Sequence, residues 1–211
     1  MMNRRFLLIP LLSLLAAGCA HQPGKLSISS GETRWVYTQK FSQAYCSRSG
    51  DGDYDIVLVE DDIHSADGDH ANAPLQPAAR PPLRQIIHIR VFWRPARGTK
   101  SDSPSATNAA IDWYVLGGGT RQDRDMLHYE GIGFIALSSA GGSVKADLRN
   151  TTLKLTDKHG QLADTFGVAR LAGSIYAKKD RIHLDDVLAQ LKARQSDSEA
   201  RQAQSAVPFT P

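Results

Sequence analysis

Residues 85–95, with the sequence QIIHIRVFWRP, decide the class of the fold. Apolar residues occupy every second position of this stretch: Ile87, Ile89, Val91 and Trp93. His88 and Arg90 lie between them. Because successive side chains of a β-strand point to opposite faces of a sheet, this alternation predicts a strand with one apolar and one polar face. The stretch AIDWYVLGGG (110–119) repeats the pattern, with Asp112 and Tyr114 on the polar side, and predicts a second strand.

The same pattern extends over most of the chain. Short segments rich in turn residues separate the candidate strands, which favours antiparallel pairing over strand–helix–strand units. The sequence therefore predicts a mainly β fold: a curved antiparallel sheet, a sandwich or a partly open barrel. Leu148 and Leu153 lie an odd number of residues apart, which predicts a bulge or tight turn near Asn150. The strands are expected at 35–45, 55–60, 84–94, 109–117, 126–137, 144–156 and 165–177.

One amphipathic helix is expected near the C-terminus, in HLDDVLAQLKARQ (183–195). Its apolar residues recur at helical spacing: Leu184, Val187, Leu188 and Leu191. Such a stripe predicts a helix over about 184–194 that packs on the sheet. The stripe ends at Gln195, so residues 195–211 are interpreted as a disordered tail.

The N-terminus has the layout of a secretory signal. Arg4 and Arg5 precede an apolar run at 6–15, and the small residues Ala16, Ala17 and Gly18 follow it. The run is shorter than the roughly 20 apolar residues that cross a bilayer, so a transmembrane anchor is not expected. Residues 1–18 are therefore interpreted as a signal peptide.

The five residues Leu15-Ala16-Ala17-Gly18-Cys19 resemble the lipobox of bacterial prolipoproteins. This resemblance covers residues 1–20 and implies that the Cys19 thiol receives a diacylglycerol and that the chain is cut just before it. It implies a fatty-acylated (palmitate-type) anchor, and Ala20 after the cysteine favours the outer membrane, facing the periplasm. The alternative is an ordinary secretory signal that ends near a cysteine. The expected organisation is a lipidated tether at 19–32 and a single β-rich domain at 33–194.

Charge and cysteine content restrict the partners. Removal of residues 1–18 leaves 193 of the 211 residues, with 23 Lys and Arg against 22 Asp and Glu. A nearly neutral chain argues against a nucleic-acid partner, which requires a basic face. Once Cys19 is lipidated, Cys46 has no intramolecular partner. It is interpreted as a small buried residue at a strand end, with an intermolecular disulfide or a nucleophile as alternatives.

An acidic segment is the first candidate site. Residues 51–70 contain eight acids, two histidines and no base. No cofactor is expected; because carboxylates and imidazoles are ligands for calcium and zinc, a divalent metal is the one alternative to that expectation. The Ala- and Pro-rich sequence that follows instead suggests a long mobile loop. The candidate ligands are Asp61, Asp62, His64, Asp67, Asp69 and His70.

A second candidate is a polar cluster on the predicted strands: His88, Asp112, His128 and Glu130. If two of these side chains met, one could orient the other for general-base chemistry, as a hydrolase requires. Histidines on strands are, however, commonly exposed to solvent without a catalytic role. The chain contains no GxSxG, HExxH or P-loop motif and no GxGxxG before a helix, which favours a protein that is not an enzyme.

Three functions follow from these observations. The first is a non-enzymatic lipoprotein with a structural or envelope-assembly role, whose partners are the membrane, through the lipid, and another envelope protein. The second is a periplasmic binding module for an apolar or glycan ligand. Its aromatic residues would line a groove, although at β spacing they more often form core. The third is the hydrolase described above. The aromatic candidates are Trp35, Tyr37, Phe41, Tyr45, Trp93 and Trp113.

Overall fold

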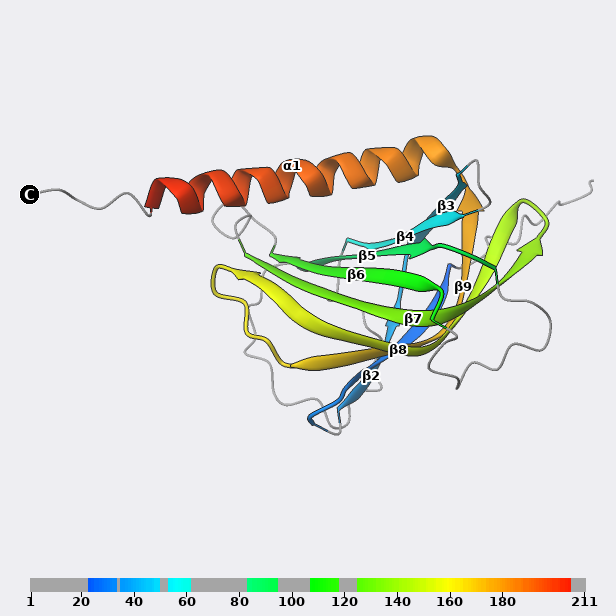
Figure 1. The fold of residues 1–211 in the computed structure, drawn as a ribbon, viewed down its shortest axis with the longest axis horizontal. Helices are drawn as coiled ribbons and strands as arrows, with labels where there is room; N and C mark the ends of the chain where they lie inside the picture. Colours follow the sequence, from blue (N-terminus) through cyan, green and yellow to red (C-terminus); the bar gives the residue numbers. More distant parts are fainter. Residues whose placement is uncertain are drawn as a thin grey trace, which may run out of the picture.

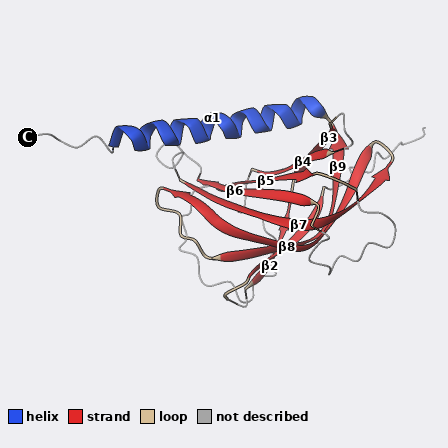
Figure 2. Ribbon diagram, in the orientation of Figure 1, coloured by secondary structure: helices blue, strands red, loops and turns tan. Residues whose placement is uncertain are grey.

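The computed structural model describes residues 23–33, 35–49, 53–61, 83–94, 107–117 and 125–205. These residues form nine β-strands and one C-terminal α-helix, so the mainly β prediction is confirmed (Figure 2). The elements are β1 (Gly24–Ser30), β2 (Val36–Lys40), β3 (Gln43–Arg48), β4 (Tyr54–Glu60), β5 (Leu83–Val91), β6 (Ala109–Gly117), β7 (Met126–Ala140), β8 (Ser143–His159), β9 (Val168–Lys179) and α1 (Arg181–Ser205).

All nine strands belong to one strongly curved sheet, in the order β2-β1-β9-β3-β4-β5-β6-β7-β8 (Figure 1). The pairs are antiparallel except for a short parallel contact between β3 and β9. Strand β9 also pairs with β8, so the sheet is partly ring-like without being a barrel. Of the predicted architectures, the curved single sheet with a helix on it is the one observed.

The two faces of the sheet carry separate apolar cores. The inner face holds the larger core, to which β5 and β6 contribute alternate residues such as Ile87 and Trp113. On each strand the intervening side chains point to the outer face, where Ile86 of β5 and Tyr114 of β6 belong to a second cluster. Helix α1 covers this outer cluster, because Leu184, Val187 and Leu191 pack there. The long apolar runs of the central strands therefore reflect burial on both faces.

Helix α1 begins earlier and ends later than predicted. Asp180 caps its first turn: its side chain accepts a hydrogen bond from the His183 backbone N–H, and its carbonyl accepts one from Leu184. The helix reaches Ser205, so the prediction of a disordered tail is wrong over 195–205. The predicted apolar stripe is correct, and the helix continues past it as a polar segment that extends beyond the strands in Figure 1.

The predicted tether is wrong over residues 24–30, which form β1. This strand pairs with β2 on one side and β9 on the other. Leu26 and Ile28 are fully buried in the inner core. Gly24 has a φ of +109° and lies against the backbone of Ser174. The strand therefore starts at a position that has no room for a side chain.

Two local irregularities determine which face the side chains reach. The strand expected over 35–45 is two strands, separated at Phe41 and Ser42, and Tyr45 consequently faces the outer cluster. In β8 the pairing with β9 shifts between Leu148 and Leu153, and Asn150 has a φ of 49°. The irregularity predicted near Asn150 is thereby confirmed.

Candidate functional site

A row of alternating carboxylates and imidazoles crosses four neighbouring strands on the outer face. We name it the outer-face row. Asp112 of β6 lies directly opposite His88 of β5 in the strand register and directly opposite Glu130 of β7 on its other side. Side chains opposite one another across a sheet share a face, so the register alone brings these groups together. The row consists of Asp55, His88, Asp112, His128 and Glu130.

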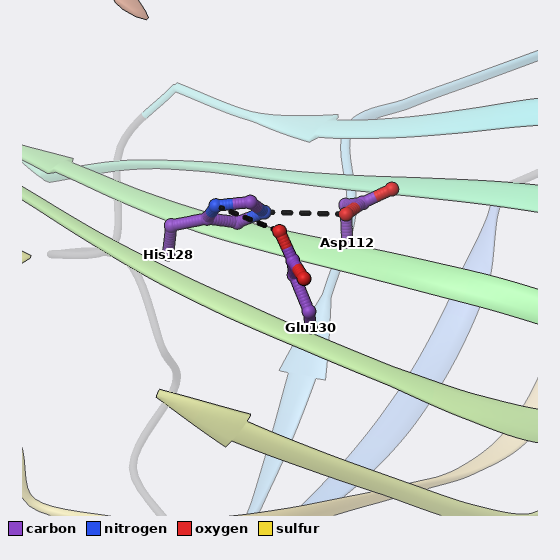
Figure 3. A group of neighbouring side chains, drawn as sticks. All are labelled: Asp112, His128 and Glu130. Atoms are coloured by element: carbon purple, nitrogen blue, oxygen red, sulfur yellow. Dashed lines mark hydrogen bonds and ion pairs between the residues drawn. The ribbon is translucent and has the colours of Figure 1, made fainter. Parts of the chain in front are cut away.

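The distances within the row make it continuous. His88 Nε2 is 3.2 Å from Asp55 Oδ1, and its Nδ1 is 3.9 Å from Asp112 Oδ2. His128 Nε2 is 3.2 Å from Asp112 Oδ1, and its Nδ1 is 3.6 Å from Glu130 Oε1. Each imidazole therefore lies between two carboxylates, and Asp112 contacts both rings. Figure 3 shows the half of the row in which His128 faces Asp112 and Glu130.

The centre of the outer-face row is buried, whereas its Glu130 end is exposed to solvent. His128 and Asp112 are only 7% and 9% exposed, whereas the Glu130 side chain is 53% exposed. The Tyr114 ring stacks on the His128 ring with centroids 4.2 Å apart. The Tyr114 hydroxyl in turn accepts a hydrogen bond from Gln195 of α1 at 3.2 Å. The helix thus holds the aromatic residue that fixes the plane of the imidazole.

The electrostatic environment favours an ionised Asp112. Burial alone would raise its pKa, but the hydrogen bond with His128 and the positive charge of Arg90 outweigh burial and lower it. Arg90 Nη2 is 3.4 Å from Asp112 Oδ2. Burial of the Tyr114 side chain, together with the nearby negative charge of Asp112, raises the pKa of Tyr114 to about 12. Tyr114 is therefore a neutral phenol at physiological pH, beside an ionised carboxylate.

Three groups of the row have the composition of a metal-binding set. Asp112, His128 and Glu130 each offer one ligand atom, and these three atoms lie within 4.8 Å of one another (Figure 3). An imidazole nitrogen with two carboxylate oxygens suits zinc and related divalent ions. The same groups also have the contacts that a general base and its orienting carboxylate require.

The structure brings together all four residues of the predicted polar cluster. The hydrolase hypothesis stays a prediction. A general base acts on a bound substrate, and the contacts of this cluster are contacts among protein side chains. Sequence reasoning missed Asp55, Arg90 and Tyr114. Asp55 stands just before the apolar run of β4, at a position whose side chain points to the outer face. That position predicts contact with His88 only when the register between β4 and β5 is known. The sequence pattern places Tyr114 on the polar face but does not indicate its stacking on His128.

The other predicted site residues lie elsewhere. Asp61 forms an ion pair with Arg84 on β5, with Oδ1 and Nε 2.7 Å apart. The remaining members of the acidic candidate lie outside the described residues, as does Cys19: Asp62, His64, Asp67, Asp69 and His70. Cys46 is buried in β3, as expected for a small core residue, and burial raises its thiol pKa to about 11.

The aromatic candidates divide between core and surface. Trp113 is fully buried, stacked on Tyr129 with centroids 4.8 Å apart and in edge contact with Phe166. It is therefore part of the core and does not line an exposed groove. Trp35 and Trp93 are 41% and 40% exposed.

Comparison with known proteins adds no further assignment. No family model, curated protein or solved structure matches the chain. Among the described residues, no helix combines the length and the apolar character that a membrane span would need.

Proposed function

We propose that the protein is a lipoprotein of the outer membrane that faces the periplasm and has a non-enzymatic, structural or envelope-assembly role through contacts with another envelope protein. The observation that carries the proposal is the lipobox-like sequence ending at Cys19, placed directly before a folded domain. A lipoprotein cysteine carries more than one acyl chain, which is what stable attachment to a bilayer requires.

The position of β1 supports a domain held close to the membrane. The strand begins at Gly24, five residues after Cys19. At about 3.4 Å per extended residue, those five residues span at most about 17 Å. A lipid on Cys19 would therefore keep the start of β1, which is paired into the sheet, within that distance of the bilayer surface. Such a short link favours partners that are themselves at the membrane.

Exposed apolar side chains support a role in protein contacts. Trp35 and Val36 are exposed at the start of β2, and Phe92 and Trp93 are exposed after β5. Aromatic side chains of this kind contribute strongly to protein interfaces because they bury a large area at a small cost in conformational entropy. The observations that favour the alternative, a ligand-binding module, are weaker because Trp113 is buried.

The anchor is tested by metabolic labelling with a fatty acid. We expect label in the wild-type chain and in Cys46→Ala, and none in Cys19→Ala, because only Cys19 follows a lipobox. Fractionation of the same cells should place wild-type protein with the outer membrane and Cys19→Ala outside that fraction. Equal labelling of the wild type and Cys19→Ala would refute the anchor.

The same strains test the contact role. A photo-crosslinking amino acid placed at Trp35 or at Phe92 is expected to give adducts of discrete size in the wild-type background. Lys192, which is exposed on α1, is the control position. The adducts should weaken when Cys19→Ala releases the protein from the membrane. The contact role is refuted by adducts that are no stronger at Trp35 or Phe92 than at Lys192.

A further inference from the structure

We propose that Asp112, His128 and Glu130 form a binding site for a divalent transition-metal ion of the zinc class on the outer face of the sheet. The site is independent of the lipid anchor and of the acidic segment at 61–70. It rests on the arrangement of the three side chains, on the residues that orient them and on the net charge of the outer-face row.

The distances are close to those that a bound ion imposes. Zinc binds nitrogen and oxygen at about 2.0–2.1 Å, so two ligand atoms of a tetrahedral site lie roughly 3.3 Å apart. His128 Nε2 and Asp112 Oδ1 are already 3.2 Å apart. One ligand atom from each of the three residues lies within 4.8 Å of the other two, and Glu130 Oε1 is 3.6 Å from the second ring nitrogen of His128, Nδ1. Because the Glu130 side chain is 53% exposed, a change of its rotamer can bring the second carboxylate closer.

The surrounding residues orient the ligands in the way that metal sites require. Asp112 has one oxygen toward His128, and its other oxygen faces Arg90 at 3.4 Å and His88 at 3.9 Å. The ring of Tyr114 stacks on His128 and holds its plane. Outer partners of this kind fix the geometry of metal ligands and are needed for affinity. The exposed Glu130 side leaves a coordination position open to water or to a further ligand.

The charge of the row matches a divalent cation. Asp55, Asp112 and Glu130 are three carboxylates, and Arg90 is the cation that contacts Asp112. The formal charges of these three carboxylates and one guanidinium sum to −2.

The test is zinc binding by full-length, untagged protein in detergent, after treatment with a chelator. We expect one zinc ion per chain by equilibrium dialysis. Cobalt should give a visible absorption band without the thiolate charge-transfer band, because the three ligands are nitrogen and oxygen. Glu130→Gln and His128→Gln should each weaken zinc binding more than tenfold, since removing a ligand costs at least as much as the 10–100-fold typical of outer partners.

Two controls locate the ion. His183→Gln removes an imidazole that also contacts a carboxylate, with Nδ1 2.9 Å from Asp180 Oδ1, and should leave zinc binding unchanged. His64→Gln combined with His70→Gln removes the imidazoles of the acidic segment and should also leave it unchanged. Far-UV circular dichroism must show that each variant is folded, and Glu130→Gln is the deciding variant because its side chain is half exposed.

The proposal is overturned by any of the following results. The wild type binds no zinc, Glu130→Gln binds it as tightly as the wild type, or the double histidine variant of the acidic segment abolishes binding. A cobalt spectrum dominated by thiolate ligation would likewise place the ion elsewhere.

Discussion

Cys46 shows how burial determines the chemistry of one residue. Its side chain is almost fully enclosed in the inner core, and its thiol lies 3.4 Å from the Ala177 carbonyl oxygen. The thiolate is the reactive form of cysteine, and burial disfavours it. The pKa of about 11 therefore makes Cys46 an inert core residue, and argues against the disulfide and nucleophile alternatives.

We predict that the Cys46 thiol does not react with a thiol reagent in the folded protein at pH 8. Its pKa lies about three units above that pH, and its side chain is closed to the reagent. Reaction should become complete on addition of denaturant. The measurement is absorbance of the released chromophore, with Cys46→Ala as the blank. Rapid labelling of the folded wild type would contradict the prediction.

At the scale of single residues, the sequence identified the chemistry of the site but not its geometry. The sequence singles out four residues because they lie on the polar faces of neighbouring predicted strands: His88, Asp112, His128 and Glu130. Their contact depends on the register of β5, β6 and β7, in which Asp112 is opposite both of its neighbours. Register is set by turns and by packing over the whole sheet, and the alternation within one strand does not contain it.

At the scale of elements, α1 depends on the sheet for its position. Leu184 is 2% exposed and packs against the outer cluster, whereas Ile182, two residues earlier, is 74% exposed. Helices in proteins gain most of their stability from such a packed face. The two residues therefore form a matched pair with which to measure the helix–sheet contact.

We predict that Leu184→Ala lowers the free energy of unfolding by about 2–5 kcal/mol, the usual cost of removing a buried leucine side chain. Ile182→Ala should change it by less than about 0.5 kcal/mol, as expected for an exposed position. Urea unfolding followed by circular dichroism measures both. Equal effects of the two substitutions would show that α1 is not held by its apolar stripe.

The elements that the sequence failed to predict have specific physical reasons. In β1 only Leu26 and Ile28 are apolar, and the serines and the glycine around them are typical of a linker. The strand exists because β9 and β2 supply its hydrogen bonds on both sides. The second half of α1 lacks an apolar stripe, although its alanine, glutamate, arginine and glutamine residues have high helix propensity. The irregularity near Asn150, by contrast, is visible in the sequence, because the flanking buried residues Leu148 and Leu153 lie an odd number of residues apart.

At the scale of the whole molecule, hydrogen-bonded carboxylates tie stability to pH. Asp164 is an example: it accepts a hydrogen bond from the Tyr129 hydroxyl at 2.5 Å and two from the backbone N–H groups of Phe166 and Gly167. Burial would raise the pKa of Asp164, but these hydrogen bonds outweigh it and lower the pKa. The pKa values of three other aspartates are also lowered: Asp112, Asp147 and Asp180.

We predict that the free energy of unfolding falls as the pH is lowered from about 5 toward 2. A carboxylate with a lowered pKa in the folded state stabilises the fold above its unfolded pKa of about 3.9, and this contribution is lost as the pH falls through the folded pKa. For Asp180 that value is about 2. Urea midpoints measured across this range test the prediction, and Asp164→Asn should flatten the curve. Midpoints that rise toward low pH would contradict it.

The pairing of β9 sets the order in which the fold can be completed. Strand β1, the first along the chain among the described strands, and strand β3 both pair with β9, which also joins β8 to close the partial ring. About 140 residues separate β1 from this partner, so the contact is strongly non-local and its formation is expected to be slow. A chain interrupted before Val168 would leave Leu26 and Ile28 with no strand beside them except β2. During synthesis, β1 must therefore wait until the chain has been made as far as β9, and only then can the partial ring close.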